Sequence, residues 1–470
     1  MTTDAASEID FSGAGDGDIA FIREQLERER LDTERLEAPQ FITIREDGRI
    51  IAFGRVKPYN ETYELGSVWV ADDRRGRGLG ERITRELVRR FPQDEVYVTT
   101  DDAVGLPAYY ERLGFLRTDI LPRELVDKIG RVRKILKRDA VGMIYDRVFD
   151  RLPTLADVYA ARERIRPHLR PTPLVRNVKL SAELECDVYL KLELLQPIGA
   201  FKVRGGVNLA AQLTDDERKR GIIGASTGNH GQSLAYAANN LGIPCIIAMP
   251  DEANPMKVAA MEALGAQVEF RGADFEEARI WAERHARETG MRYVHHIRAP
   301  ELVAGVGTIS LELIEDLPDV DTIICPAGGG SALVGHCIVA KALRPGVEII
   351  GVQAEAAPAI YNSWRDRRIQ EAPIATAAEG LATGAAYYPA VRTFIEKLDD
   401  MILVSEDEIA EAMRALARTA HLVAEHAGAT STAAAYKLRD HLRGKKVALI
   451  VSGGNLPLDG LRDILSAGDV

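Results

Sequence analysis

A lysine set among glycines, Lys202, is the residue of this chain whose surroundings best suit covalent chemistry. It lies in the stretch GAFKVRGG, which runs from Gly199 to Gly206. The amine of a lysine can condense with an aldehyde and hold it covalently. The apolar run DVYLKLELLQPI before it predicts a strand, and a helical pattern begins after it. We therefore expect Lys202 at a strand-to-helix junction, where side chains project into a cleft.

Three further motifs each follow an apolar run that predicts a strand. The stretch STGNHGQ (226–232) follows IIGA, and its amides and hydroxyls are suited to a substrate carboxylate. The stretch PAGGGSALVG (326–335) follows TIIC and opens a helix, which predicts a phosphate cradle of N–H groups. The stretch SGGN (452–455) ends the last strand. Ligands of parallel sheets bind at the carboxyl ends of strands, so we expect one shared site.

In this order, the four motifs resemble the fold-type II pyridoxal phosphate (PLP) enzymes, and within them the threonine/serine dehydratase and serine racemase branch. The likeness covers about residues 153–465 and implies that Lys202 binds PLP covalently. It places Ser226, Thr227, Gly228 and His230 at the substrate. Around PLP it places Phe201, Asn229, Gly328, Gly329, Gly330, Ser331, Glu379 and Ser452.

The residue that the resemblance places at the pyridine nitrogen, Ser452, bears on the reaction. A neutral hydroxyl does not keep that nitrogen protonated, which favours loss of a β-substituent over transamination. The expected reaction converts a β-hydroxy-α-amino acid, such as L-threonine or L-serine, to a 2-oxo acid and ammonia. The resemblance implies that Lys202 removes the Cα proton and that the PLP phosphate protonates the leaving hydroxyl.

Several alternatives remain on the same scaffold. Hydroxyaspartate and hydroxyectoine-derived amines are alternative substrates. Racemisation is an alternative reaction that needs an acid or base opposite Lys202, where Thr227 stands in the place of a racemase serine. Racemase-type members bind a divalent cation, but Gln353 and Ala359 occupy the corresponding positions, so we expect no metal. We also expect no feedback through a C-terminal regulatory module.

A second glycine-rich loop, RGRGLG (75–80), lies in the first third of the chain. It follows the predicted strand YELGSVWV (63–70), and a helix is expected from about Glu81. Backbone N–H groups at a helix N-terminus, together with arginines, suit a pyrophosphate. The residues expected to bind it are Arg75, Gly76, Arg77, Gly78 and Gly80.

With the later stretch AYYERLGF, this loop resembles the GNAT acetyltransferase family. The resemblance implies acetyl-CoA as ligand. It implies Tyr110 as the acid that protonates the leaving thiolate and Glu64 as a general base. A non-catalytic acyl-CoA sensor is the alternative function of this domain.

The elements expected in the first domain are a helix over residues 18–37, a hairpin from QFITIRE and RIIAFGRV, and a last strand over 138–148. A helix start is expected at Pro153-Thr154. We therefore predict an α/β chain, with a GNAT-like α+β domain over residues 1–147. A two-subdomain, tryptophan synthase β-like PLP domain with parallel sheets follows over residues 151–470.

Composition excludes several classes of function. The chain has 470 residues and a net charge of −11, which argues against non-specific binding of nucleic acids or anionic membranes. The N-terminus does not resemble a signal peptide, and no apolar run is long enough to span a membrane. Four widely spaced cysteines suit a reducing cytoplasm. The small-molecule enzyme so predicted is expected to form a homodimer or higher homo-oligomer through its PLP domain.

Overall fold

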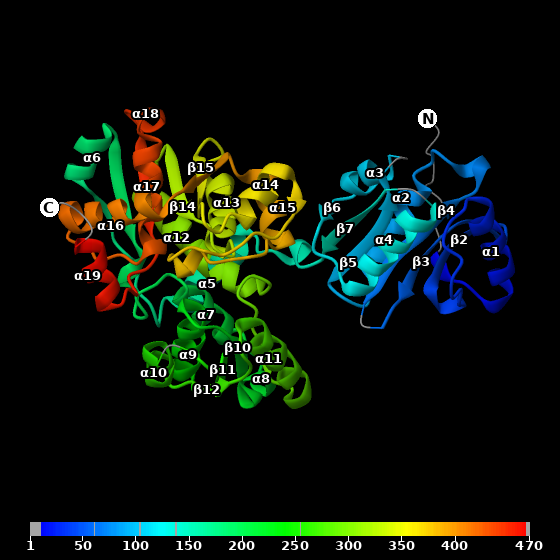
Figure 1. Ribbon diagram of the computed structural model, residues 1–470, viewed down its shortest axis with the longest axis horizontal. Helices are drawn as coiled ribbons and strands as arrows, with labels where there is room; N and C mark the ends of the chain where they lie inside the picture. Colours follow the sequence, from blue (N-terminus) through cyan, green and yellow to red (C-terminus); the bar gives the residue numbers. More distant parts are fainter. Residues whose placement is uncertain (1–10, 61, 103–104, 137–138, 254, 467–470) are drawn as a thin grey trace. The chain divides into compact units, whose positions relative to one another are not determined.

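The computed structural model describes residues 11–60, 62–102, 105–136, 139–253 and 255–466. The chain forms two compact units, Met1–Arg147 and Val148–Val470 (Figure 1). The elements of the first unit are β1 (Phe11–Gly13), α1 (Ile19–Arg28), β2 (Phe41–Glu46), β3 (Arg49–Pro58), β4 (Tyr63–Val70), α2 (Leu79–Arg90), β5 (Glu95–Asp101), α3 (Leu106–Arg112), β6 (Leu116–Thr118), α4 (Arg123–Leu136) and β7 (Ala140–Asp146).

The first unit is built on a mixed sheet with the strand order β1-β2-β3-β4-β5-β7-β6. Helix α2 packs closely on β3 at Gly54. A Cβ at this position would lie only 2.7 Å from Ile83 and 2.8 Å from Leu87 of the helix. An extra residue enters β4 opposite β3, and Ser67 there has a φ of 50°. Such a bulge bends a strand. Among the described residues, β4 pairs with β5 at one position alone, Glu64 with Tyr97.

The second unit alternates strands and helices through most of its length. Its elements are α5 (Leu155–Ile165), β8 (Leu174–Arg176), α6 (Val178–Leu184), β9 (Asp187–Leu192), α7 (Val203–Ala211), α8 (Asp215–Arg220), β10 (Ile222–Ala225), α9 (Asn229–Leu241), β11 (Cys245–Met249), α10 (Pro255–Ala263), β12 (Gln267–Phe270), α11 (Phe275–Thr289), β13 (Arg292–Tyr293), α12 (Pro300–Asp316), β14 (Thr322–Pro326), α13 (Ser331–Leu343), β15 (Glu348–Ala354), α14 (Ala359–Asp366), β16 (Arg368–Ile369), α15 (Tyr388–Lys397), β17 (Asp400–Val404), α16 (Glu406–Ala420), α17 (His426–Lys437), α18 (Arg439–Leu442), β18 (Lys446–Val451) and α19 (Leu458–Ser466).

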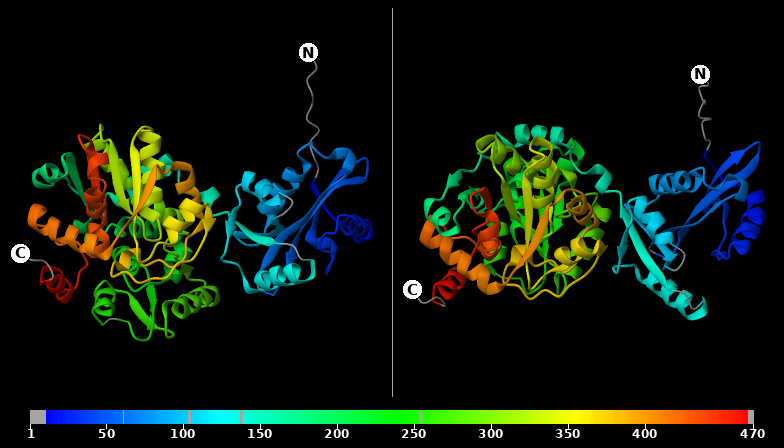
Figure 2. Two further views of the ribbon diagram at one scale, coloured as in Figure 1. Left: turned by 45° about the horizontal axis from the view of Figure 1, so that its top comes forward. Right: turned by 90° about the horizontal axis from the view of Figure 1, so that it is seen from above.

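The smaller subdomain of this unit is the green segment with the labels α9, α10, α11 and β10–β12 at the bottom of Figure 1, and it is also at the bottom of the left view of Figure 2. Its sheet has the order β12-β11-β10-β13, and every pairing is parallel. Neighbouring residues of β10 enter different cores: Ile222 packs with α7 and α9, whereas Ile223 packs with α11. Both faces of the sheet are therefore covered by helices, which explains its continuous apolar strands.

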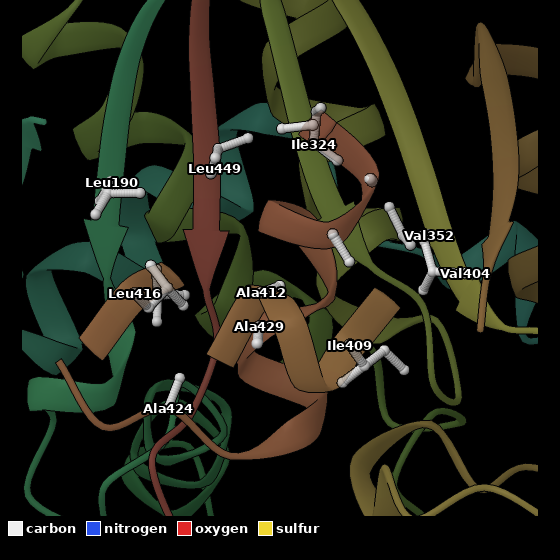
Figure 3. Close-up of a cluster of buried hydrophobic side chains, with 14 of the residues drawn as sticks. Leu190, Ile324, Val352, Val404, Ile409, Ala412, Leu416, Ala424, Ala429 and Leu449 are labelled. Atoms are coloured by element: carbon white, nitrogen blue, oxygen red, sulfur yellow. The ribbon is translucent and has the colours of Figure 1, made fainter. Parts of the chain in front are cut away.

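The larger subdomain has the sheet order β17-β15-β14-β18-β9-β8. All pairings are parallel except that of β8 with β9. One face of this sheet is buried against α16 and α17, and Figure 3 shows side chains of the strands meeting those of the helices. The labelled residues of this core are Leu190, Ile324, Val352, Val404, Ile409, Ala412, Leu416, Ala424, Ala429 and Leu449.

The predicted fold class is confirmed, with local corrections. The helix expected over residues 18–37 ends at Arg28. Helix α4 and the antiparallel edge strand β8 were not expected. The helix start at Thr154 is confirmed: its hydroxyl accepts from the N–H of Asp157, whose carboxylate accepts from the N–H of Thr154. Among the described residues, no helix combines the length and apolar character needed to cross a membrane.

Candidate active site

The segment that carries Lys202 is fixed between the end of β18 and the start of α7. The N–H of Phe201 donates to the carbonyl of Ser452 at 3.1 Å, and Ala200 bridges to Gly453. The Lys202 amine donates to the hydroxyl of Ser331 at 3.0 Å. Three of the four sequence motifs therefore meet at this lysine, as the strand-end argument predicts.

The glycines of the loop before α13 have no space for side chains. A Cβ on Gly328 would lie 2.0 Å from the carbonyl oxygen of Gly380, and one on Gly329 would lie 2.9 Å from the ring of His296. Gly330 has a φ of +97°, a conformation that favours glycine. The N–H groups of residues 328–331 donate to no other described residue. Four free donors, a helix N-terminus and the Ser331 hydroxyl form a cradle that fits a phosphate.

Burial lowers the pKa of the Lys202 amine to about 8. With this pKa, about a tenth of the amine is neutral at pH 7. The neutral amine is the form that attacks a carbonyl carbon. The amine also lies 5.1 Å from the centre of the Phe201 ring. Lysine, phosphate cradle and aromatic ring together fit PLP.

In the loop before α9, the hydroxyl of Ser226 forms hydrogen bonds within the loop, whereas that of Thr227 forms none with a described residue. The Ser226 hydroxyl accepts from the N–H groups of Gly228, at 3.2 Å, and Gly231, at 3.0 Å. The hydroxyl of Thr227 bonds to no other described residue. His230 is buried, and its Nε2 lies 3.1 Å from the carbonyl of Val294. Burial lowers its pKa to about 4, so it is neutral.

A carboxylate that the sequence did not suggest, Glu425, lies beside Asn229. The Asn229 amide donates to Glu425 at 3.0 Å and accepts from Asn455 at 2.7 Å. Burial raises the pKa of Glu425 to about 7, despite the hydrogen bond from Asn229. No local motif announces Glu425, which precedes the first residue of α17. The predicted residue Glu379 is mostly exposed and forms an ion pair with Lys257 at 2.6 Å.

Two histidines and a tyrosine, also not predicted, lie next to the phosphate cradle. The rings of His295 and His296 stack at 4.5 Å, and the ring of Tyr387 lies 5.2 Å from each. The ring of His296 is what a Cβ added at Gly329 would meet. Burial holds the pKa of His296 well below its usual range, and that of His295 at about 3. Both rings are therefore neutral rather than cationic.

The helix that begins after Lys202 is anchored by a buried ion network around Arg204. Its guanidinium donates to Glu193 at 2.8 Å and to Glu312 at 2.6 Å. Glu312 also accepts from Lys191 at 2.7 Å. Two buried cations thus meet two buried carboxylates, the arrangement that makes buried charge tolerable. The network ties β9 and α12 to the helix that positions Lys202.

Gln353, which stands at the position where racemase-type members are expected to have a metal ligand, bonds instead to the start of α14. The Gln353 side-chain oxygen accepts from the N–H groups of Ile360, at 3.1 Å, and Tyr361, at 2.9 Å, in the first turn of α14. Within the described ranges, no group of three or more His, Cys, Asp or Glu side chains is arranged to hold a metal. Metal independence of the reaction stays a prediction.

The loop before α2 in the first unit has the expected backbone geometry. Gly76 and Gly78 have φ angles of 77° and 76°, and Gly78 is the last residue before the helix. The Arg75 guanidinium is paired with Glu29 at 2.6 Å and Asp72 at 3.1 Å. Arg77 forms no ion pair with a described residue. Exposed pairs are worth about 0–1 kcal/mol, so Arg75 can exchange its partners for a pyrophosphate.

The two residues expected to act in acetyl transfer are both buried. Tyr110 packs against Phe115, with ring centres 5.4 Å apart, and burial raises its pKa, which keeps the phenol protonated. Glu64 accepts a hydrogen bond from Tyr59 at 3.0 Å and forms an ion pair with Lys128 at 2.6 Å. The predicted base is thus already paired with an amine.

Comparisons with known proteins follow the division into two units. Residues 165–453 match the family of pyridoxal-phosphate dependent enzymes, and residues 14–115 match the acetyltransferase (GNAT) family. The L-threonine ammonia-lyase of Thermotoga maritima is 40% identical over 321 residues, which cover 67% of this chain and 79% of the relative. The L-threonine dehydratase catabolic TdcB of Staphylococcus aureus is 38% identical over 323 residues, covering 67% and 92%.

Solved structures of such enzymes are similar to about the same share of this chain. The processed form of threonine deaminase isoform 2 from Solanum lycopersicum is 29% identical, with a TM-score of 0.64, and the match covers 66% of this chain and 86% of that one. The serine racemase of Dictyostelium discoideum is 34% identical, with a TM-score of 0.62, and the match covers 65% and 99%. With the lysine, the phosphate cradle and these relatives in agreement, the chain belongs to the family of pyridoxal-phosphate dependent enzymes, and a GNAT-family domain precedes the part that matches it.

Proposed function

We propose that the second unit catalyses the dehydration and deamination of a β-hydroxy-α-amino acid, such as L-threonine or L-serine, to a 2-oxo acid and ammonia. The observation that carries the proposal is the Lys202 amine, buried, lowered in pKa and bonded to Ser331 of the phosphate cradle. The relatives named as threonine ammonia-lyase and threonine dehydratase support this substrate class.

The protein side chains divide the work of this reaction. Bound PLP would supply an electron sink for the electron pair that remains on Cα when its proton is removed. Lys202 would hold the cofactor until the substrate amine displaces it, and the freed neutral amine would then be the base that takes the Cα proton. The free N–H groups of residues 328–331 hold the phosphate, and the loop at residues 226–229 holds the substrate carboxylate. Ser452 offers a neutral hydroxyl rather than a carboxylate, which suits β-elimination.

The test of this proposal is a screen of the purified full-length protein against β-hydroxy-α-amino acids, with 2-oxo acid and ammonia as readouts. The wild-type protein is expected to be yellow and to retain PLP on Lys202 after borohydride reduction. A Lys202→Ala variant should lose the covalent adduct and the activity. An adduct that persists on another lysine in this variant would contradict the assignment, as would a screen in which no hydroxy-amino acid yields 2-oxo acid.

Racemisation is a second candidate because the hydroxyl of Thr227 is unengaged in the described structure. Racemisation removes a proton from one face of Cα and returns one to the other face, so it needs a proton-transferring group, such as a hydroxyl, opposite the lysine. The discriminating measurement is the rate of D-serine formation from L-serine, compared with the rate of 2-oxo acid release. A Thr227→Val variant should lose racemisation and keep elimination.

For the first unit, we propose binding of acetyl-CoA at the loop of residues 75–80. The left-handed glycines, the start of α2 and Arg77 support binding of its pyrophosphate. Acetyl transfer would use Tyr110 as acid and Glu64 as base, whereas a sensor would bind the ligand without turnover. A Gly78→Glu variant should abolish the rise in Tm caused by acetyl-CoA. Tyr110→Phe should keep that rise and slow thiol release if the domain is an enzyme.

We further propose that the protein works in the cytoplasm as a homo-oligomer formed through the second unit. The four cysteines are free and buried, as suits a reducing compartment. Exposed apolar residues occur on and near the edge strand β8, namely Val175, Val178 and Leu195. Light scattering of the full-length protein tests the assembly, and a monomer at micromolar concentration would contradict it.

A further inference from the structure

Helix α4 places a lysine amine directly against the proposed base of the first unit. The Lys128 Nζ lies 2.7 Å from one carboxylate oxygen of Glu64 and 2.6 Å from the other. The carboxylate side chain is 4% exposed and the lysine side chain 18%. The amine therefore contacts both oxygens of the base, while part of the lysine side chain remains accessible.

This pair lies where the sheet of the first unit opens. Glu64 is at the one described pairing of β4 with β5, and it also accepts from the N–H of Thr99 on β5 at 3.2 Å. Beyond this point, β4 and β5 share no further pairing among the described residues. Backbone polar groups in such a position need a ligand or water to bond to. An extended acyl chain carries polar groups that can bond to these strands, and one bound along this stretch would bring its reactive end close to Glu64 and Lys128.

We propose that Lys128 is an acetyl acceptor of its own domain, so that the first unit acetylates itself at this side chain. The inference rests on the proposed binding of acetyl-CoA. The lysine nitrogen forms an amide bond with the acetyl carbon as the carbon–sulfur bond of the thioester breaks. One proton of the ammonium passes to Glu64 and then to solvent, and a second ends on the sulfur. The products are acetyl-lysine and free CoA.

The other two lysines of this unit that the structure describes, Lys57 and Lys134, lack the same arrangement. The Lys57 amine is paired with Asp32, at 2.6 Å, and with Glu34, at 3.3 Å, rather than with Glu64. Lys134, six residues after Lys128 on the same helix, is exposed. Holding an amine beside its base within one molecule removes the entropic cost of bringing them together. The acetylation should therefore be selective and independent of protein concentration.

The test incubates the full-length protein with acetyl-CoA and follows the acetylation of Lys128 and Lys134 by peptide mass spectrometry. Lys128 is expected to gain one acetyl group at least about tenfold faster than Lys134, because its amine is preorganised. Tenfold dilution of the protein should leave the first-order rate unchanged. Glu64→Gln should slow the reaction, and Glu64→Asp, which keeps the charge, provides a second variant should the first fail to fold. Lys134→Arg should leave the rate at Lys128 unchanged.

Two negative results have different meanings. A protein whose Tm rises with acetyl-CoA, but whose Lys128 is unmodified or modified no faster than Lys134, overturns the self-acetylation and leaves acetyl-CoA binding intact. A protein whose Tm does not respond to acetyl-CoA overturns both. A rate that rises with protein concentration shows transfer between molecules and likewise contradicts the proposal.

Discussion

At the scale of single residues, Glu425 should make the folding stability of the second unit depend on pH. It contacts Asn229, which the resemblance places at the PLP ring, and burial raises its pKa to about 7. The folded protein therefore keeps a proton that the unfolded chain loses above the ordinary value of 4.5. Folding stability should fall as the pH rises from about 5 to about 7, because the folded state binds more protons over this range.

Glu425→Gln should remove this pH dependence in the PLP-free protein. The variant is expected to be more stable than the wild type at pH 8, by at most about 3 kcal/mol, and to lose this advantage near pH 5. Denaturant unfolding at both pH values measures the difference. Glu411→Gln is the matched control, because Glu411 is largely exposed and paired with Arg414. Parallel pH profiles of Glu425→Gln and wild type would contradict the burial argument.

At the scale of elements, the site depends on close contacts between turns at strand ends. The Gly328 Cα faces the carbonyl of Gly380, and Gly199 has a φ of 68° and faces Asn455. The buried network of Arg204 ties α7 to α12. A turn that shifts by a few tenths of an ångström would move the phosphate cradle relative to Lys202.

Gly328→Ala tests this dependence. Its Cβ would lie 2.0 Å from a backbone oxygen, which cannot move aside as a flexible side chain can. We expect at least about a tenfold loss of PLP affinity, which corresponds to about 1.4 kcal/mol. A fluorescence titration of the PLP-free protein provides the measurement. Gly346→Ala, where nothing lies within 4 Å, should bind PLP normally. Equal affinity of both variants would show that the loop moves freely.

Chelation tests the element that follows β15. Gln353 bonds to the first turn of α14, which leaves its side-chain oxygen unavailable as a metal ligand. Treatment with a chelator is expected to leave 2-oxo acid formation and Tm unchanged. A large loss restored by Mg²⁺ would show a cation site that this interpretation omits.

At the scale of the whole molecule, each unit has its own apolar core. The core of the first unit includes Leu65, Ile83 and Phe115, and that of the second includes Leu190, Ile324 and Leu449. Chains with separate cores depart from two-state unfolding. The two proposed ligands would each bind one unit, so each should stabilise a different part of the chain.

Calorimetry of the full-length protein should therefore show two transitions. PLP is expected to raise the temperature of one, and acetyl-CoA that of the other, because a ligand stabilises the folded state that binds it. At a hundredfold excess over Kd, the gain is about 2.7 kcal/mol. A single transition raised by both ligands would show that the units unfold together, and would favour the sensor function of the first.

The sequence by itself was sufficient for the fold class and for the meeting of the motifs that contain Lys202, Ser331 and Ser452. Strand, glycine turn and helix follow one another in the sequence at Lys202, Gly328 and Gly78, and such local patterns reflect backbone sterics and hydrogen bonding. Helix α4 and the early end of α1 escaped prediction. In α1, the charged pattern continues past Arg28, but the chain turns away to cover β3.

The tertiary structure alone decided which distant side chains meet. Asn229 and Glu425 are 196 positions apart, and Glu64 and Lys128 are 64 apart. Neither Glu425 nor Lys128 belongs to a sequence motif. A charged residue at a helix start or on a helix surface is usually solvated, so nothing in the sequence marks these two as buried or paired. The raised pKa of Glu425 and the pairing of Lys128 arise from packing against elements that lie far away along the chain. Such effects depend on the packed structure and have no local signature in the sequence.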